Sequence, residues 1–108
     1  MHGSLLELYT TRDQHHQGQE LITWLLEEAR RFGVPGATMA SAGLGFGQGG
    51  RLHSAHFFEL ADEPVYLRFI AEDDLVTRFM AHLESLQLHL FYVRIPAQFG
   101  RLGQVQDA

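Results

Sequence analysis

The sequence predicts an α+β protein with a ferredoxin-like βαββαβ sandwich, in which one antiparallel sheet carries two helices on one face. Two segments carry apolar residues at helical spacing, residues 19–32 and a second stretch that begins at Asp73 or Asp74. Other segments favour strands, and the order is strand, helix, strand, strand, helix, strand. Two helices cannot cover both faces of a four-stranded sheet, so both are expected on the same face.

The first half of the chain supplies a strand, a helix and a weaker strand. Residues 5–11 mix leucine, tyrosine and threonine, which favours a strand, and the polar stretch 13–18 is expected to be a loop. The helix over residues 19–32 ends where Gly33 offers a C-cap. Residues 37–42 are small and form a candidate second strand before a glycine-rich segment.

The second half begins with residues 56–60 (HFFEL), which can be extended, and residues 61–64, which are expected to turn. Residues 65–71 then alternate between the two faces of a strand. One face carries Val65, Leu67, Phe69 and Ala71, and the other carries Tyr66, Arg68 and Ile70. Asp73 or Asp74 is expected to cap the helix that follows.

The last strand and the two ends complete a single domain over residues 1–108. Residues 88–95 favour the final strand, which Pro96 is expected to close. Residues 1–4 are expected to be a leader, and residues 97–108 are expected to form a mobile polar tail. A chain of this length builds one hydrophobic core.

The uncovered face of the sheet carries side chains that are too apolar to remain in water in a stable monomer. They include Tyr66, Ile70 and either Tyr92 or Phe91. We therefore expect other copies of the chain to cover this face in a closed symmetric oligomer. The alternative is a monomer with scattered exposed aromatic side chains.

Charge and composition narrow the function classes. Eight basic and thirteen acidic residues give a formal net charge of −5, which argues against non-specific nucleic-acid binding. The chain has no cysteine, so disulfides and thiolate metal sites are excluded and the cytoplasm is the expected compartment. No apolar run approaches the roughly 20 residues that span a bilayer, and the N-terminus lacks a signal-peptide pattern. Membrane contact would therefore go through a membrane protein.

The glycine-rich segment holds five glycines between residues 43 and 50, around a single aromatic side chain, Phe46. Backbone N–H groups in such a turn can approach an anion closely, and Arg51 is the only cation in the stretch. The sequence has neither the Gly-Lys-Ser/Thr of a phosphate loop nor a G-x-G-x-x-G pattern that opens a helix. Two interpretations stay open, a flexible hairpin connection and a functional loop that binds a ligand or a partner.

Seven histidines raise the question of a metal site. His53 and His56 are three residues apart and would point to opposite faces of a strand, so the two do not form a joint site. A site built from several copies around a symmetry axis is the alternative. Serine, histidine and acidic residues form no recognisable catalytic arrangement, so we expect neither catalytic residues nor enzymatic activity.

Residues 36–73, GATMASAGLGFGQGGRLHSAHFFELADEPVYLRFIAED, resemble the PII-like proteins of the DUF190 family. In that family a Gly-Ala-Thr strand leads to a Gly-Phe-Gly turn, a histidine follows in a short basic segment, and a later strand ends in acidic residues. The resemblance implies a PII-like homotrimer whose sheets face inward. It also implies clefts between subunits that hold a small effector such as an adenine nucleotide, and a loop that docks on a partner such as a membrane transporter.

The residue match assigns parts of the effector site. The Gly-Ala-Thr segment stands near the base, the Gly-Phe-Gly-Gln turn stands at the start of the loop near the phosphates, and an arginine and a histidine follow within the loop. The resemblance therefore implies an effector-binding set of Gly36, Ala37, Thr38, Gly45, Phe46, Gly47, Gln48, Arg51 and His53.

Two features depart from the family pattern. Ser41 and Ala42 stand where the family usually carries an arginine and a glycine, and ESLQLHLFYV stands where true PII proteins carry a glycine- and lysine-rich phosphate loop. The preferred hypothesis is a signalling and regulatory module. The alternatives are a metal-binding trimer similar to the divalent-cation tolerance proteins and a small cofactor-free enzyme on the same fold.

Overall fold

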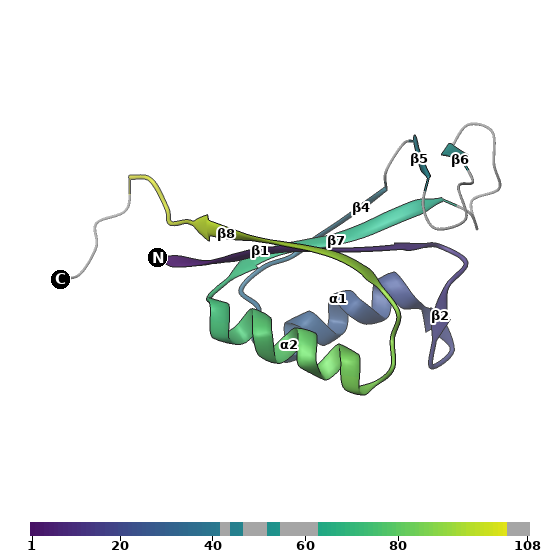
Figure 1. Ribbon diagram of the computed structural model, residues 1–108, viewed down its shortest axis with the longest axis horizontal. Coiled ribbons are helices and arrows are strands. Elements are labelled where there is room, and N and C mark those ends of the chain that lie inside the picture. Colours follow the sequence, from purple (N-terminus) through teal and green to yellow (C-terminus); the bar gives the residue numbers. More distant parts are fainter. Residues whose placement is uncertain (42–43, 47–51, 55–62, 104–108) are drawn as a thin grey trace.

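The computed structural model describes residues 1–41, 44–46, 52–54 and 63–103. Four strands form one antiparallel sheet in the order β4-β7-β1-β8, and two helices cover one of its faces (Figure 1). The elements are β1 His2–Thr11, α1 Leu21–Arg31, β4 Thr38–Ser41, β7 Pro64–Ala71, α2 Asp73–Ser85 and β8 Phe91–Gln98. The predicted α+β sandwich with both helices on one face is confirmed.

Alternation along β7 separates the two faces of the sheet as predicted. Its apolar set is buried against the helices, while Arg68 and Ile70 on the other face are exposed. Phe79 of α2 is fully buried and meets the rings of Phe32 and Phe69 edge to face, at centroid distances of 5.3 and 5.6 Å. Burial of such a side chain contributes about 1.5–3 kcal/mol, so these rings are a main source of cohesion between helices and sheet.

Tertiary contacts decide how α2 begins. The helix starts at Asp73, but the predicted cap at Asp73 or Asp74 is wrong, because the N-cap position is Glu72 and no side chain caps the helix. The Asp73 carboxylate instead accepts a hydrogen bond of 2.5 Å from the hydroxyl of Ser4 in β1. Arg94 of β8 donates to the Asp73 carbonyl at 3.1 Å, so this corner is joined by residues far apart in sequence.

The first and last strands of the sheet extend further than the sequence predicted. β1 begins at His2, three residues earlier than predicted, and Gly3 lies directly against the backbone of Ala71. Pro96 does not close the last strand, which runs to Gln98 with Pro96 opposite Ser4. A proline is tolerated there because β8 is an edge strand and has a neighbour on one side alone.

The polar stretch predicted as a loop holds a small hairpin. Its strands are β2 His15–His16 and β3 Gln19–Glu20, joined by Gln17 and Gly18 at φ of +52° and +81°. Positive φ at both turn residues is typical of a type I′ hairpin turn, which glycine favours. The hairpin also explains why α1 starts at Leu21, two residues later than predicted.

The expected strand over residues 56–60 lies outside the described residues. Within the described part of the chain, no helix is long and apolar enough to cross a bilayer.

Candidate functional site

The glycine-rich segment contains a two-stranded ladder. β5 Leu44–Phe46 pairs with β6 Leu52–Ser54, which places Gly45 opposite His53 and Phe46 opposite Leu52. The ladder is a sheet of its own and lies beyond the ends of β4 and β7, far from the N-terminus (Figure 1). Within the segment, β5 and β6 are therefore an antiparallel pair outside the main sheet, which both interpretations of the sequence allow.

The nine predicted effector residues fall into three groups. Gly45, Phe46 and His53 belong to the β5–β6 hairpin, whereas Gly47, Gln48 and Arg51 lie outside the described residues. The remaining three are exposed and lie before or at the start of β4, namely Gly36, Ala37 and Thr38. Thr38 is the first residue of β4 and Ser41 is the last, so about 10 Å of strand separates this group from the hairpin end.

A polar cluster that sequence reasoning missed lies at the foot of the hairpin. Glu63, just before β7, is only 8% exposed, and its carboxylate accepts a hydrogen bond of 2.7 Å from Arg12 Nε. Interaction with the Ser41 hydroxyl and the hydrogen bond from Arg12 outweigh the effect of burial and lower the pKa of Glu63. The carboxylate is therefore ionised at neutral pH.

The open face of the sheet forms a second candidate surface. Cross-strand register places Phe91 opposite Tyr9, which lies opposite Tyr66, so Phe91 and not Tyr92 belongs to this face. Both ring pairs have centroid distances of 5.9 Å, and Phe91 remains 70% exposed. Ile70 and Ile95 extend the apolar surface, with exposures of 37% and 48%.

A charged pair lies in the middle of this apolar face. The Arg68 guanidinium donates to the carboxylate of Glu7 at 2.7 Å from Nε and lies 5.0 Å above the ring of Tyr66. Burial and a hydrogen bond to Glu7 raise the pKa of the Tyr9 hydroxyl, which keeps it protonated. The face thus combines exposed rings with a satisfied ion pair, a composition suited to contact with protein rather than with water.

The chain has an open groove of about 670 Å³ beside the C-terminal end of α2. Leu8 and Leu83 line its apolar part, and Glu84, Gln87 and His89 contribute polar groups. Gln87 has a φ of +60° in the turn that follows α2. This turn carries neither the glycines nor the lysine of a PII phosphate loop, so it offers no cationic side chain to a phosphate.

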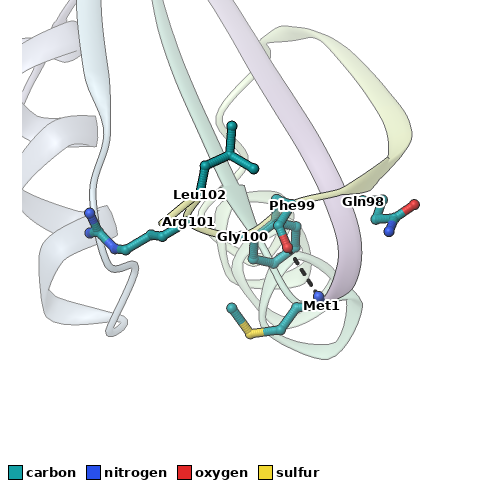
Figure 2. A pocket seen from close by; sticks show the side chains of 6 residues that line it. All are labelled: Met1, Gln98, Phe99, Gly100, Arg101 and Leu102. Carbon is teal, nitrogen blue, oxygen red and sulfur yellow. Dashed lines mark hydrogen bonds between the residues drawn. The ribbon is translucent and has the colours of Figure 1, made fainter. Parts of the chain in front are cut away.

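A shallower pocket of about 370 Å³ lies at the opposite end of the sheet, where Met1 lies beside the residues that follow β8 (Figure 2). There the Met1 amino group donates to the carbonyl of Phe99 at 3.0 Å, and Leu102 is fully exposed. Its distance from the glycine segment excludes it from the same site.

Three of the described histidines contact or border other parts of the fold. The ring of His16 lies edge-on to Trp24 at 4.4 Å, and Trp24 is buried. His82 Nε2 lies 2.6 Å from the Glu28 carboxylate and joins the two helices, while His89 borders the groove. Across the described ranges, no three histidine or acidic side chains are grouped closely enough to hold a metal ion.

Sequence comparison identifies the class to which this fold and these surfaces belong. Residues 3–95 match the DUF190 family, described as uncharacterized ACR, and the chain belongs to that family. The UPF0166 protein of Aquifex aeolicus (strain VF5) is 30% identical over 82 residues, which cover 75% of this chain and 78% of that protein.

Solved structures of CPII, a nitrogen regulatory PII-like protein from Thiomonas intermedia K12, share the fold. The form bound to ADP and bicarbonate aligns with a TM-score of 0.67 at 17% identity and covers 94% of this chain and 91% of CPII. The form bound to ADP, AMP and bicarbonate aligns with a TM-score of 0.65 at 21% identity and the same coverage. The chain therefore has a PII-like fold, as its sequence predicted.

Proposed function

We propose that this protein is a PII-like signalling protein that binds an adenine nucleotide between copies of the chain and acts on a partner through its glycine segment. The observation that carries the proposal is the likeness to CPII over 94% of the chain, since CPII is bound to ADP in that structure. Membership of DUF190 and the hairpin between β4 and β7 support the same conclusion.

The proposed nucleotide site begins at the hairpin. Gly45 and Phe46 of β5 and His53 of β6 are the described residues that we propose for this site, and Gln48 and Arg51 belong to the same segment of the sequence. Glycine permits the close backbone approach that a phosphate needs, and an arginine can bind a phosphate through two hydrogen bonds.

The missing phosphate loop sets the expected selectivity. The turn after α2 contains no lysine, and the chain as a whole has a net charge of −5. A third phosphate would therefore add negative charge without a matching cation, which is unfavourable in a site of low dielectric. We expect ATP to bind no more tightly than ADP.

The open sheet face supports a homotrimer as the functional unit. This face exposes apolar side chains to water, namely Phe91, Ile70 and Ile95. Identical copies arranged in a closed ring can bury them. A projecting hairpin then remains free to reach a partner, for which we propose a membrane transporter.

Isothermal titration calorimetry with ADP, AMP, ATP and a cyclic nucleotide tests the proposal. ADP is expected to bind with a Kd below about 1 mM, a binding free energy stronger than about −4 kcal/mol. The variant Arg51→Ala is expected to weaken ADP binding roughly tenfold through loss of a charged hydrogen bond. Arg78→Ala is the matched control, because Arg78 is a 59% exposed arginine of α2 paired with Asp74. If no nucleotide binds below the millimolar range, the proposal is wrong.

A further inference from the structure

The two ends of the glycine segment join the sheet side by side, next to the buried carboxylate of Glu63. Ser41 is the last residue of β4 and Glu63 immediately precedes β7, so the first lies where the segment leaves the sheet and the second where it returns. Ser41 pairs with Val65 of β7, and the carboxylate of Glu63, two residues before Val65, is held by Arg12 Nε at 2.7 Å. The two ends of the segment thus lie side by side at the sheet, and the Glu63 side chain joins them to Arg12 at the end of β1.

Arg12 connects this junction to a third part of the fold. Its backbone N–H donates to the Glu63 carbonyl at 3.1 Å, which adds a main-chain link to the side-chain ion pair. Its Nη1 atom lies 3.7 Å from the carboxylate of Glu20, the last residue of β3 and the N-cap position of α1. The Glu63 side chain is 10% exposed and that of Glu20 is 40% exposed, so the pair with Glu63 is the less screened contact.

The topology gives these contacts a particular importance. β5 and β6 are hydrogen-bonded to each other and form a sheet separate from the four-stranded sheet. We therefore expect the contacts at Ser41 and Glu63, where the segment joins the main sheet, to influence the direction of the hairpin.

We propose that Glu63 is a positioning residue that fixes where the glycine segment leaves and re-enters the sheet, and that Arg12 links this junction to the β2–β3 hairpin. The positioning role stands on the contacts of the ligand-free chain. A consequence for effector response rests on the proposed function: nucleotide bound at β5–β6 would be felt at β2–β3 through Arg12.

Hydrogen exchange of the ligand-free protein tests the positioning role. Glu63→Gln keeps the shape of the side chain but removes the charge that Arg12 binds. We expect amide exchange in β5–β6 and β2–β3 to become at least about tenfold faster, the size expected from losing a charged hydrogen bond. Glu28→Gln is the matched control, because Glu28 is also a nearly buried carboxylate, 13% exposed, that binds an arginine and a histidine away from the hairpin feet.

A milder variant separates positioning from general loss of stability. Ser41→Ala removes one donor at an exposed position, and exchange is expected to rise in β5–β6 while the centres of β1 and β7 keep the wild-type rate. The positioning role is overturned if Glu63→Gln leaves both hairpins at wild-type rates, or if it speeds exchange equally across the whole sheet.

The same measurement with ADP tests the link through Arg12. ADP is expected to slow exchange in β5–β6 and β2–β3 of the wild type, and in β5–β6 alone of Arg12→Gln. Equal slowing of β2–β3 in Arg12→Gln would overturn the link. Failure of ADP to bind the wild type would overturn the proposed function, while the ligand-free exchange rates would still decide the role of Glu63.

Discussion

Replacement of Phe91 by serine should dissociate the proposed trimer. Phe91 lies on the open sheet face next to Tyr9 and is 70% exposed in the single chain. Seventy per cent of the ~200 Å² of a phenylalanine side chain is about 140 Å², which corresponds to about 3.5 kcal/mol per subunit at ~25 cal/mol per Å². Loss of this free energy weakens association by about two to three orders of magnitude.

Light scattering coupled to size exclusion measures the outcome at micromolar concentration. The wild type is expected to elute as a trimer and Phe91→Ser as a monomer with an unchanged circular dichroism spectrum. Leu102→Ser is the control, because Leu102 is fully exposed but lies near the termini and off the sheet face (Figure 2). A trimeric Phe91→Ser, or a monomeric wild type, would refute the assignment of this face as the subunit interface.

Two further predictions concern stability. A hydrogen bond from His82 is the main cause of the lowered pKa of Glu28, so its contribution is present above the ordinary carboxyl pKa and is lost as the pH falls through the lowered value. Thermal melts between pH 7 and 3 should show that Glu28→Gln lowers the free energy of unfolding by about 1–2 kcal/mol at pH 7. The variant should also lose less stability than the wild type as the pH falls, and an equal loss in both proteins would contradict this. Gly3→Ala would place a Cβ 2.1 Å from the carbonyl oxygen of Ala71 and should cost about 3 kcal/mol in urea unfolding. Gly36→Ala has no atom within 4 Å of its new Cβ and should change stability by less than about 0.5 kcal/mol, so equal losses in the two variants would oppose the packing argument.

Periodic segments could be predicted from the sequence because their burial is decided within the segment. β7 alternates buried and exposed residues along its length, and the stripe of α2 places Val76, Phe79 and Leu83 in the core. Short polar strands such as β2 and β3 carry no such pattern, since two residues cannot show a period of two.

Contacts between distant residues explain the remaining errors. The predicted cap at Asp73 is wrong because the Asp73 carboxylate accepts a hydrogen bond from Ser4, which is 69 residues away in the sequence. The ion pair at the hairpin foot joins residues 51 apart, Arg12 and Glu63, and no local motif marks either of them. Ser41 was visible as a departure from the family pattern, and the structure places it at the end of β4, paired with Val65.

Titration of the purified protein with ADP tests the proposed nucleotide binding most directly. We expect saturable binding with a Kd below about 1 mM, and ATP should bind no more tightly than ADP. Absence of binding by ADP, AMP, ATP and a cyclic nucleotide at millimolar concentration would contradict it.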